Sequence, residues 1–519
     1  MRILALSPMI AFALLSTACL SDTNGAETSQ PNIVFILCDD LGYGDVGCNN
    51  PECKIPTPCV DRLAAGGMRF TDAHTTSSVC TPTRYGVLTG RYNWRSRLQS
   101  SVLGGMSPRL IEPGRLTVAE MLRRQGYHTA AIGKWHLGME WTRKPGTEPF
   151  KDRIEKGAEG WNADFSRPIT NGPNAVGFNY FFGIAASLDM VPYTYIENDR
   201  VTDLPTIDNA YPMMLGKARE TRRGPAAANF DAMNVLPDLT DKAVEYIGKR
   251  AETSKPFFLY LPLASPHTPI VPSPEWQGKS GINPYADFVM QTDHCVGRVL
   301  NALKSTGVAD NTLVIFTSDN GCSPQADFPL LEEHGHDPSA IFRGHKADIW
   351  DGGHRVPFIV RWPCKIKAGS TSDQLVGLVD FQATCADITG VKLPASAAED
   401  SVSLLPILLG KTTEAIREAL VHHSISGKFS IRQGRWKLEL CPGSGGWSAP
   451  RDPQAVKQGL PSLQLYDMEA DPSEQKNVQA DHPDVVKHLT QLLERYVAQG
   501  RSTPGEPQQN TVPVDIWKK

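Results

Sequence analysis

The sequence predicts an α/β fold in which a large, mostly parallel sheet carries helices on both faces. Continuous apolar runs, typical of buried parallel strands, alternate with helical patterns to about residue 390. Past Leu405 the pattern changes to short alternating runs around turns, which indicates a small antiparallel sheet. A helical pattern over Pro483–Gln499 closes the chain. We therefore expect an N-terminal domain over residues 31–405 and a C-terminal subdomain over residues 406–519, in which the closing helix packs on the small sheet.

Length and composition are those of an ordinary globular protein. The chain has 519 residues, enough for a large domain with an appended one, and it is 40% hydrophobic and 21% charged. Its formal net charge of -4 gives no indication of a nucleic-acid-binding surface. We therefore expect a well-packed protein that does not bind nucleic acid.

Residues 1–21 have the pattern of an export signal. Arg2 is followed by the apolar run Ile3–Leu15 and by the small residues of Ser16–Ala18, where cleavage is expected. The run is too short to span a membrane, and no later stretch is long and apolar enough. Ser-Thr-Ala-Cys19 also resembles a lipoprotein cleavage box, although Ser16 stands where Leu is usual. We expect a periplasmic or extracellular protein, either freely exported or lipid-anchored at Cys19.

The expected elements follow from apolar periodicity and from helix start and stop residues. Thr117 and Glu120 form a capping box, and their helix ends at Gly126. Residues 140–235 are weakly periodic and rich in Gly, Pro and Asn, which predicts long insertions of the kind that set substrate choice. The expected strands are Asn32–Cys38, Tyr127–Ile132, Phe257–Leu263, Thr312–Thr317, Val356–Arg361, Phe429–Arg432, Trp436–Leu440 and Gln464–Tyr466, and the other long helices are Pro237–Arg250 and Pro284–Lys304.

Charged and polar residues stand at the carboxyl ends of four apolar strands. Because open α/β sheets build their sites at this edge, we expect these residues to lie together. Adjacent carboxylates at the end of a buried strand need a cation or donors beside them, and oxygen ligands suit Ca²⁺ or Mg²⁺ far better than zinc. Two histidines add proton carriers. The residues at the four strand ends are Asp39 and Asp40, Lys134 and His136, His267, and Asp319 and Asn320.

The segment Ser78–Gly90 places a cysteine just before a predicted helix. Thr81 is the expected cap, and Pro82 suits the first helical position. Cys80 would then face the positive end of the helix, where anions bind and thiols acidify, with Arg84 about one turn on. For a lone cysteine, a small buried side chain is the alternative interpretation.

Two motifs carry a family resemblance. Cys80-x-Pro-x-Arg84, followed by an apolar pair and Thr-Gly, resembles the signature of the type I sulfatases, which belong to the alkaline phosphatase superfamily. The stretch Gly126–His136 resembles the second sulfatase signature at every fixed position. The resemblance extends over residues 31–496 and includes the Asp-Asp and Asp-Asn pairs. It implies an alkaline-phosphatase-like fold and an arylsulfatase-like enzyme that hydrolyses sulfate monoesters.

The resemblance also implies a cofactor, a partner and residue roles. In this family the cysteine is oxidised to formylglycine, whose hydrate is the nucleophile, so a formylglycine-generating enzyme is the implied partner. One Ca²⁺, or Mg²⁺ in its place, is implied on Asp39, Asp40, Asp319 and Asn320 together with the modified Cys80. In the implied mechanism Asp319 accepts a proton from the hydrate, and Arg84 holds the hydrate in place. Lys134 and Lys346 neutralise the sulfuryl oxygens. His267, with Lys346, faces the leaving oxygen as proton donor, and His136 deprotonates the remaining hydroxyl to expel sulfate. The chief departure is Arg343–Lys346, where many relatives carry Gly-Gly-Lys.

Two other functions are compatible with the same residues. A phosphonate monoester or phosphodiester hydrolase would use the same nucleophile and a similar metal site. A non-catalytic sulfoglycan-binding protein would keep the cysteine unmodified. We expect a sulfated glycan as the substrate, with aryl sulfates as simpler substitutes. Four aromatic residues near the insertions either stack on sugar rings or belong to the local core: Trp135, Trp141, Trp161 and Tyr193.

Three further motifs are interpreted structurally. Gly42–Gly47 matches G-x-G-x-x-G, but no helix follows and nearby aspartates would repel a pyrophosphate, so the glycines are expected to form a tight loop. Cys48, Cys53 and Cys59 have no histidine nearby, which favours a disulfide or unpaired thiols over zinc. His334–Asp337 is expected in a solvated or substrate-rim loop, in preference to a metal site.

Overall fold

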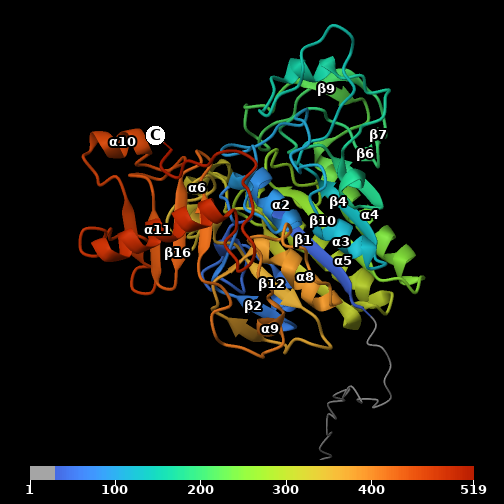
Figure 1. Ribbon diagram of the computed structural model, residues 1–519. Helices are drawn as coiled ribbons and strands as arrows, with labels where there is room; N and C mark the ends of the chain where they lie inside the picture. The colour runs from blue at the N-terminus through green and yellow to red at the C-terminus, as the bar shows by residue number, and fades with distance from the viewer. Residues whose placement is uncertain (1–29, 519) are drawn as a thin grey trace, which may run out of the picture.

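The computed structural model describes residues 30–518, so the predicted signal and Cys19 lie outside the described residues. A ten-stranded sheet lies at the centre of the molecule (Figure 1). Five neighbouring strands in the middle of the sheet are parallel, and antiparallel pairs extend it on both sides. The strand order is β13 (Ser370–Ser372), β2 (Met68–Phe70), β12 (Phe358–Arg361), β11 (Thr312–Ser318), β1 (Asn32–Asp39), β10 (Phe257–Pro266), β4 (His128–Lys134), β5 (Tyr180–Ile184), β6 (Ile196–Glu197) and β7 (Arg200–Val201).

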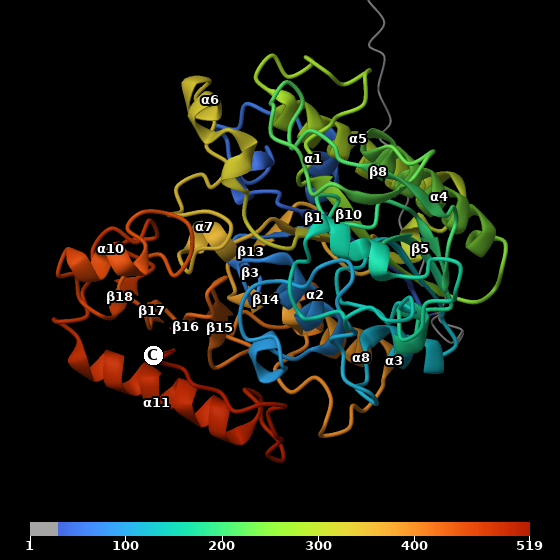
Figure 2. The same ribbon diagram turned by 90° about the horizontal axis from the view of Figure 1, so that it is seen from above.

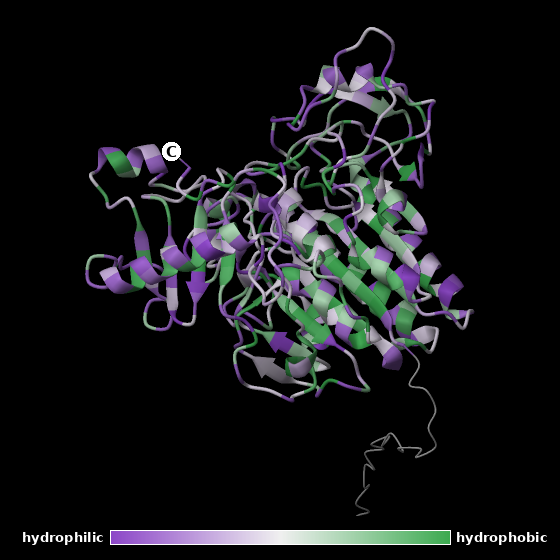
Figure 3. Cartoon of the chain, in the orientation of Figure 1, coloured by the Kyte–Doolittle hydropathy of each residue, from purple (hydrophilic) through white to green (hydrophobic). Residues whose placement is uncertain are grey.

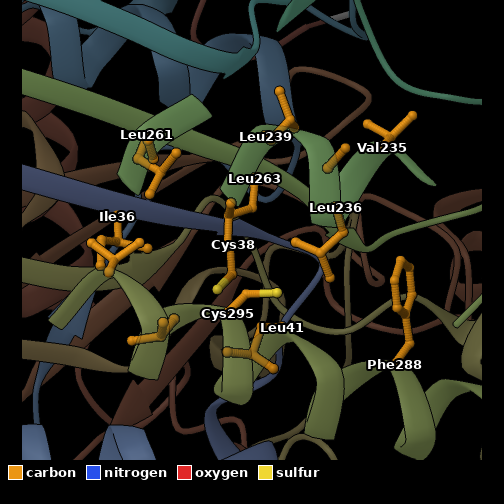
Figure 4. Packing of buried hydrophobic residues seen from close by; sticks show 14 of the residues in the cluster. Ile36, Cys38, Leu41, Val235, Leu236, Leu239, Leu261, Leu263, Phe288 and Cys295 are labelled. Atoms are coloured by element: carbon orange, nitrogen blue, oxygen red, sulfur yellow. The ribbon is translucent and has the colours of Figure 1, made fainter. Parts of the chain in front are cut away.

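Helices cover both faces of the sheet, which confirms the predicted fold class. Successive side chains of β1 point to opposite faces, so Ile36 and Cys38 join one core and Phe35 joins the other. Figure 4 shows the first core, where Cys38 lies near Leu236 and Cys295. The first core contains residues of α1 (Pro58–Ala65), α4 (Val235–Ala251) and α5 (Pro284–Ser305), and the second contains residues of α2 (Cys80–Thr89), α3 (Val118–Arg124) and α8 (Phe381–Thr389). Apolar residues concentrate on the central strands between these layers (Figure 3).

The predicted helix starts agree with the structure where a side chain caps the helix. The Thr117 hydroxyl accepts a hydrogen bond from the Glu120 backbone N–H at 3.0 Å, which is one half of the predicted capping box. The Glu120 carboxylate instead accepts from Arg123 and Arg124. The Asn283 side chain caps α5 in the same way, by accepting from the Ala286 N–H at 2.9 Å. The long helices α4 and α5 begin and end within two residues of the predicted positions, although no side chain caps α4.

The insertion over residues 140–235 contains more structure than its sequence predicts. Within it, β5 pairs with β4 and continues the parallel run, while β8 (Pro205–Asn209) and β9 (Gly224–Ala227) form a separate antiparallel pair. Figure 1 shows the β9 region beyond one end of the central strands. The sequence does not predict β8 and β9 because they are short and, as in the Gly-Pro-Ala-Ala of β9, carry no apolar alternation. In contrast, β5 is a five-residue apolar run, Tyr-Phe-Phe-Gly-Ile, inside this insertion.

Glu155, in this insertion, provides a pH-dependent test of stability. Burial raises the pKa of its carboxyl to about 7, although its Oε1 accepts from the Gly105 N–H at 3.2 Å. A raised pKa means that the native state holds the proton more tightly, so stability falls as the pH rises from about 4.5 through 7. We expect Glu155→Gln to unfold like the wild type at pH 5 but to be more stable by about 2–3 kcal/mol at pH 8.5. Urea unfolding at both pH values measures this, and parallel pH profiles would rule it out.

The C-terminal subdomain is built on a four-stranded antiparallel sheet. Its strands are β15 (Leu420–His423), β16 (Phe429–Gln433), β17 (Trp436–Glu439) and β18 (Gln464–Asp467), of which the sequence predicts all but β15. The closing helix α11 (Pro483–Gln499) lies along this sheet (Figure 2), and its Leu489 and Leu493 share a core with Ile431 and Leu438. The short helices of this half and of the preceding loops are α6 (Phe328–Glu333), α7 (Asp351–His354), α9 (Leu405–Leu408) and α10 (Asp452–Lys457).

A buried lysine joins this sheet to the large domain. Lys437 of β17 donates from Nζ to Asp351 of α7 at 2.9 Å and to Glu474 at 2.7 Å, and lies 3.2 Å from Glu439. All four side chains are fully buried, so removing the lysine leaves the carboxylates of Glu439 and Glu474 without their cation, while Arg355 still pairs with Asp351 at 2.8 Å.

We expect Lys437→Met to lower the free energy of unfolding by about 3–5 kcal/mol. The matched control is Lys249→Met, which removes a lysine paired with Glu245 on the exposed face of α4 and should cost less than about 0.5 kcal/mol. Urea unfolding of both variants measures the difference. Equal costs would show that the buried network contributes no more than a surface pair.

Three buried histidines also meet at this junction. The histidines are His74, which lies in β3 (Ala73–His74), His354 and His422. Each contributes one ring nitrogen, and these three nitrogens lie within 4.8 Å of one another. The His354 and His422 rings stack at 3.9 Å with an interplanar angle of 10°. Ring lone pairs lie in the ring plane, so two stacked rings do not direct them to one point. We interpret this cluster as packing between the two domains.

Two smaller predictions can also be compared with the structure. Cys48, Cys53 and Cys59 are free thiols, so no disulfide links them. Within residues 30–518 no helix combines the length and the apolar character needed to cross a membrane.

Candidate active site

Cys80 is the first residue of α2, so the helix begins two residues earlier than the sequence predicts. The helix is preceded by Val79 as the cap, so the assignments of Thr81 to the cap and Pro82 to the first helical position are wrong. The Thr81 hydroxyl instead accepts a hydrogen bond from the Leu103 N–H at 3.2 Å. Every residue of α2 is buried, which fixes Cys80 rigidly at the carboxyl edge of the sheet.

The predicted acidification of the Cys80 thiol is also wrong. Burial raises its pKa to about 12, because desolvation outweighs the nearby positive charges of Lys134 and Lys346. A thiol in this state is protonated at neutral pH and is a poor nucleophile. The position therefore suits a cysteine that does not react as a thiolate.

Around Cys80, three carboxylates each meet a cationic side chain. Arg84 donates from Nη2 to Asp319 Oδ2 at 2.7 Å and from Nη1 to the Lys134 carbonyl at 3.0 Å. Lys134 donates to Asp39, and Lys346 lies 2.6 Å from Asp40 Oδ1. Every one of these side chains is buried. The strand ends and Cys80 thus lie together. Lys346 also contacts this cluster, although residues 343–346 depart from the Gly-Gly-Lys of many relatives.

The backbone at this point adopts unusual conformations. Asp40 and His136 have φ values of 64° and 55°, in the left-handed region that non-glycine residues rarely occupy. The Asn320 amide donates to Asp40 Oδ1 at 2.7 Å and holds that carboxylate in place. Such conformations cost about 1–3 kcal/mol each and persist where the surrounding structure imposes them, most often at functional sites.

The two predicted histidines differ in their contacts. His136 donates from Nε2 to the Leu103 carbonyl at 2.7 Å, and its buried Nδ1 has no hydrogen-bond partner. Burial, with Lys134 and Arg84 nearby, holds its pKa well below the usual range, so the ring is neutral and Nδ1 is a bare acceptor. His267 donates from Nδ1 to the Thr268 carbonyl at 2.6 Å, and its Nε2 lies 3.5 Å from Asp40 Oδ2.

The acidic cluster fits a hard cation. Asp39 Oδ1 and Asn320 Oδ1 are buried oxygens with no hydrogen-bond partner. Ligand atoms of Asp39, Asp40, Cys80 and His267 lie within 4.8 Å of one another. Burial and the Asp39 charge raise the pKa of Asp319 to about 7, the effect expected of carboxylates crowded together. Unpaired oxygens beside crowded carboxylates are the donor set that Ca²⁺ prefers.

A second polar network supports this edge of the sheet. Asp45 accepts hydrogen bonds from the Gly42 N–H at 2.7 Å, the Tyr285 hydroxyl and His336 Nε2. His336 is therefore buried, so the expected solvated or rim loop is wrong for this residue, whereas His334 is exposed as expected. A side chain at Gly42 or Gly44 would collide with carbonyls of residues 337–338, which confirms the tight-loop interpretation of the G-x-G-x-x-G match.

A cavity of about 330 Å³ opens above the cluster. Cys80, His267 and Lys346 line it, whereas the other predicted site residues lie behind them. Its remaining lining comes largely from segments 187–190 and 219–222 of the insertion and from Ile425 and Trp447 of the C-terminal subdomain. Sequence reasoning missed these residues, because no motif marks them. Of the aromatic candidates, Trp135, Trp141 and Tyr193 are buried core residues.

Known proteins are similar to this chain in sequence and in structure. The family description Sulfatase matches residues 31–391, and the description N-sulphoglucosamine sulphohydrolase, C-terminal, matches residues 345–440. An N-acetylgalactosamine-6-O-sulfatase of Bacteroides thetaiotaomicron is 34% identical over 95% of this chain and 98% of its own length. Human arylsulfatase A is 32% identical over 90% of this chain and 88% of its own.

A solved structure, described as part of the metabolism of multiple glycosaminoglycans by Bacteroides thetaiotaomicron, is similar throughout. It is 34% identical, covers 90% of this chain and 99% of its own, and superimposes with a TM-score of 0.77. The sequence match and the shared fold agree with the site geometry. The chain therefore belongs to the sulfatase family of the alkaline phosphatase superfamily and is a hydrolase of sulfate esters.

Proposed function

We propose that this sulfatase removes sulfate from a sulfated glycan, using formylglycine made from Cys80 and one bound Ca²⁺. The observation that carries the proposal is the meeting of Cys80, unpaired buried oxygens and paired cations at the floor of one cavity. The 34% identical relative named as an N-acetylgalactosamine-6-O-sulfatase supports a saccharide substrate. The proposal includes export from the cytoplasm and maturation by a formylglycine-generating enzyme.

Asp39, Asp40, Asp319 and Asn320 would hold the Ca²⁺, because they supply the unpaired and crowded oxygens of the cluster. The ion would supply positive charge beside a sulfate oxygen, and formylglycine would supply a hydrated aldehyde as nucleophile. Both groups suit a site in which the unmodified thiol stays protonated.

The chain's own residues would bind the sulfate and move protons. Lys134 and Lys346 place two buried ammonium groups beside Cys80, where they would stabilise the negative charge of a sulfuryl group. Asp319, held in place by Arg84 at 2.7 Å, would accept a proton from the hydrate. His267 lies at the cavity floor, where its Nε2 would protonate the departing alcohol, and the bare Nδ1 of His136 would accept a proton.

Rates on three classes of substrate test the proposal. Enzyme produced with a formylglycine-generating enzyme should release sulfate from aryl sulfates and sulfated saccharides, and chelation should remove the activity until Ca²⁺ is restored. Faster turnover of an aryl phosphodiester or phosphonate monoester would instead favour the phosphonate hydrolase function. Retention of sulfated glycan without any sulfate release would favour a non-catalytic binding protein.

A further inference from the structure

Two polar atoms of the cavity lining have no hydrogen-bond partner. Ser187 Oγ and Asp189 Oδ1 are buried and unpaired, although both residues face the cavity above Cys80. A buried polar atom without a partner costs about 1–3 kcal/mol, so native proteins rarely keep one without a use. We propose that Ser187, Asp189 and Arg222 form a hydroxyl-binding wall, which selects a single sulfated sugar ring over an aryl sulfate.

Arg222 leaves one Asp189 oxygen available. It donates from Nη1 to Asp189 Oδ2 at 2.8 Å and to the Asp189 carbonyl at 2.9 Å. Both contacts use one nitrogen, so Asp189 does not occupy the other N–H groups of the guanidinium. The hydroxyl-binding wall thus offers an anionic acceptor beside a cationic donor. Neighbouring hydroxyls of a sugar ring, each both donor and acceptor, satisfy that pair together.

The hydroxyl-binding wall is held rigidly from behind. Tyr193 is buried and donates its hydroxyl hydrogen to the Arg222 carbonyl, while its ring packs edge-on against Tyr211. Ser187 and Met190 are joined by a backbone hydrogen bond of 3.0 Å, which fixes the turn that carries Asp189. A fixed arrangement of this kind selects ligands by geometry, because it does not rearrange around a poor fit.

The rest of the cavity suits one ring. Val102, Met190, Ile425 and Trp447 belong to one apolar cluster and line the cavity, which gives a surface for the C–H groups of a sugar. A volume of about 330 Å³ is at the small end of ligand cavities, which span about 300–1,000 Å³. This volume accommodates one sulfated sugar ring.

An aryl sulfate has no sugar hydroxyls, so it leaves the polar groups of the hydroxyl-binding wall without hydrogen-bond partners. A site built to bind a substrate hydroxyl strongly disfavours a substrate that lacks it. This inference rests on the proposed sulfatase function, so the test compares two substrate classes in each variant. The probes are 4-nitrophenyl sulfate and the best substrate from a panel of hexose and hexosamine monosulfates.

We expect Asp189→Ala to lower kcat/KM on the sugar sulfate by about 10–100-fold, and Ser187→Ala by about 5–10-fold, with little change on the aryl sulfate. Ser187→Ala removes a buried, unpaired hydroxyl and no hydrogen bond of the protein, so its thermal stability should not fall below that of the wild type. The control Asp241→Ala removes an exposed Arg–Asp pair with Arg298 and should leave both rates unchanged.

The outcomes separate the inference from the proposed function. Equal losses on both substrates, or no loss on the sugar sulfate, would overturn the hydroxyl-binding wall while leaving the sulfatase function intact. The same holds if the wild type hydrolyses the aryl sulfate but no sugar in the panel. If the wild type releases sulfate from neither class, the proposed function itself fails.

Discussion

Replacing Cys80 with alanine should abolish sulfate release, with a fall in kcat of at least about 10⁴-fold. The reason is that formylglycine is made from this residue, and none of the surrounding side chains can supply an equivalent nucleophile. The side chain is small and buried, so the fold should persist and the variant should still bind sulfated ligand. Initial rates of sulfate release and a binding titration measure the two properties.

The control for this prediction is Cys385→Ala. Cys385 is also buried, and burial raises its pKa well above the usual value, but it lies in α8 in the core beneath the sheet. Its replacement should cost some stability and leave kcat unchanged. Substantial sulfate release by Cys80→Ala would contradict the assignment of the nucleophile.

Replacing Asp319 with asparagine should lower kcat/KM by about 10³-fold, the second largest effect. The change keeps the shape of the side chain but removes a negative charge that Arg84 contacts at 2.7 Å and that the proposed Ca²⁺ requires. It also removes the group that accepts a proton. Calcium affinity from calorimetry should fall together with the rate.

Asp293→Asn is the matched control for Asp319. Asp293 is a buried carboxylate that accepts from the backbone N–H groups of Cys59 and Val60 at the start of α1. Its replacement should cost about 1 kcal/mol of stability through the weaker helix cap, with no loss of rate or calcium affinity. A similar loss of rate in both variants would show that Asp319 acts only through stability.

The sequence predicts the site better than it predicts the fold around it. The end of each apolar run in the sequence locates the end of a strand. Because parallel strands present their carboxyl ends at one edge of the sheet, the residues that follow these runs are expected to lie together. They are Asp39, Lys134, His267 and Asp319. Cys80 and Arg84 are placed by a motif. The helix start after Thr117 is predicted because the Thr117 side chain caps that helix. The start of α2 is missed by two residues, because its cap is Val79, which has no side-chain acceptor.

The features that the sequence misses depend on tertiary contacts. The pKa of Cys80 is raised because α2 is buried on all sides, which no local pattern reports. His336 is buried because Asp45 lies opposite it, 291 residues away in sequence. The hydroxyl-binding wall comes from an insertion with no periodicity. Its residues could be found only once the chain had folded around the cavity.

Mass spectrometry of the tryptic peptide Phe70–Arg84 tests the central claim most directly, because that peptide contains Cys80. The enzyme should be purified from its native host, or from cells that express a formylglycine-generating enzyme, and its sulfatase activity measured on the same sample. We predict the mass of an aldehyde, in which the thiol sulfur and two hydrogens have been replaced by one oxygen. A fully active sample in which the peptide carries only an intact thiol would contradict the account.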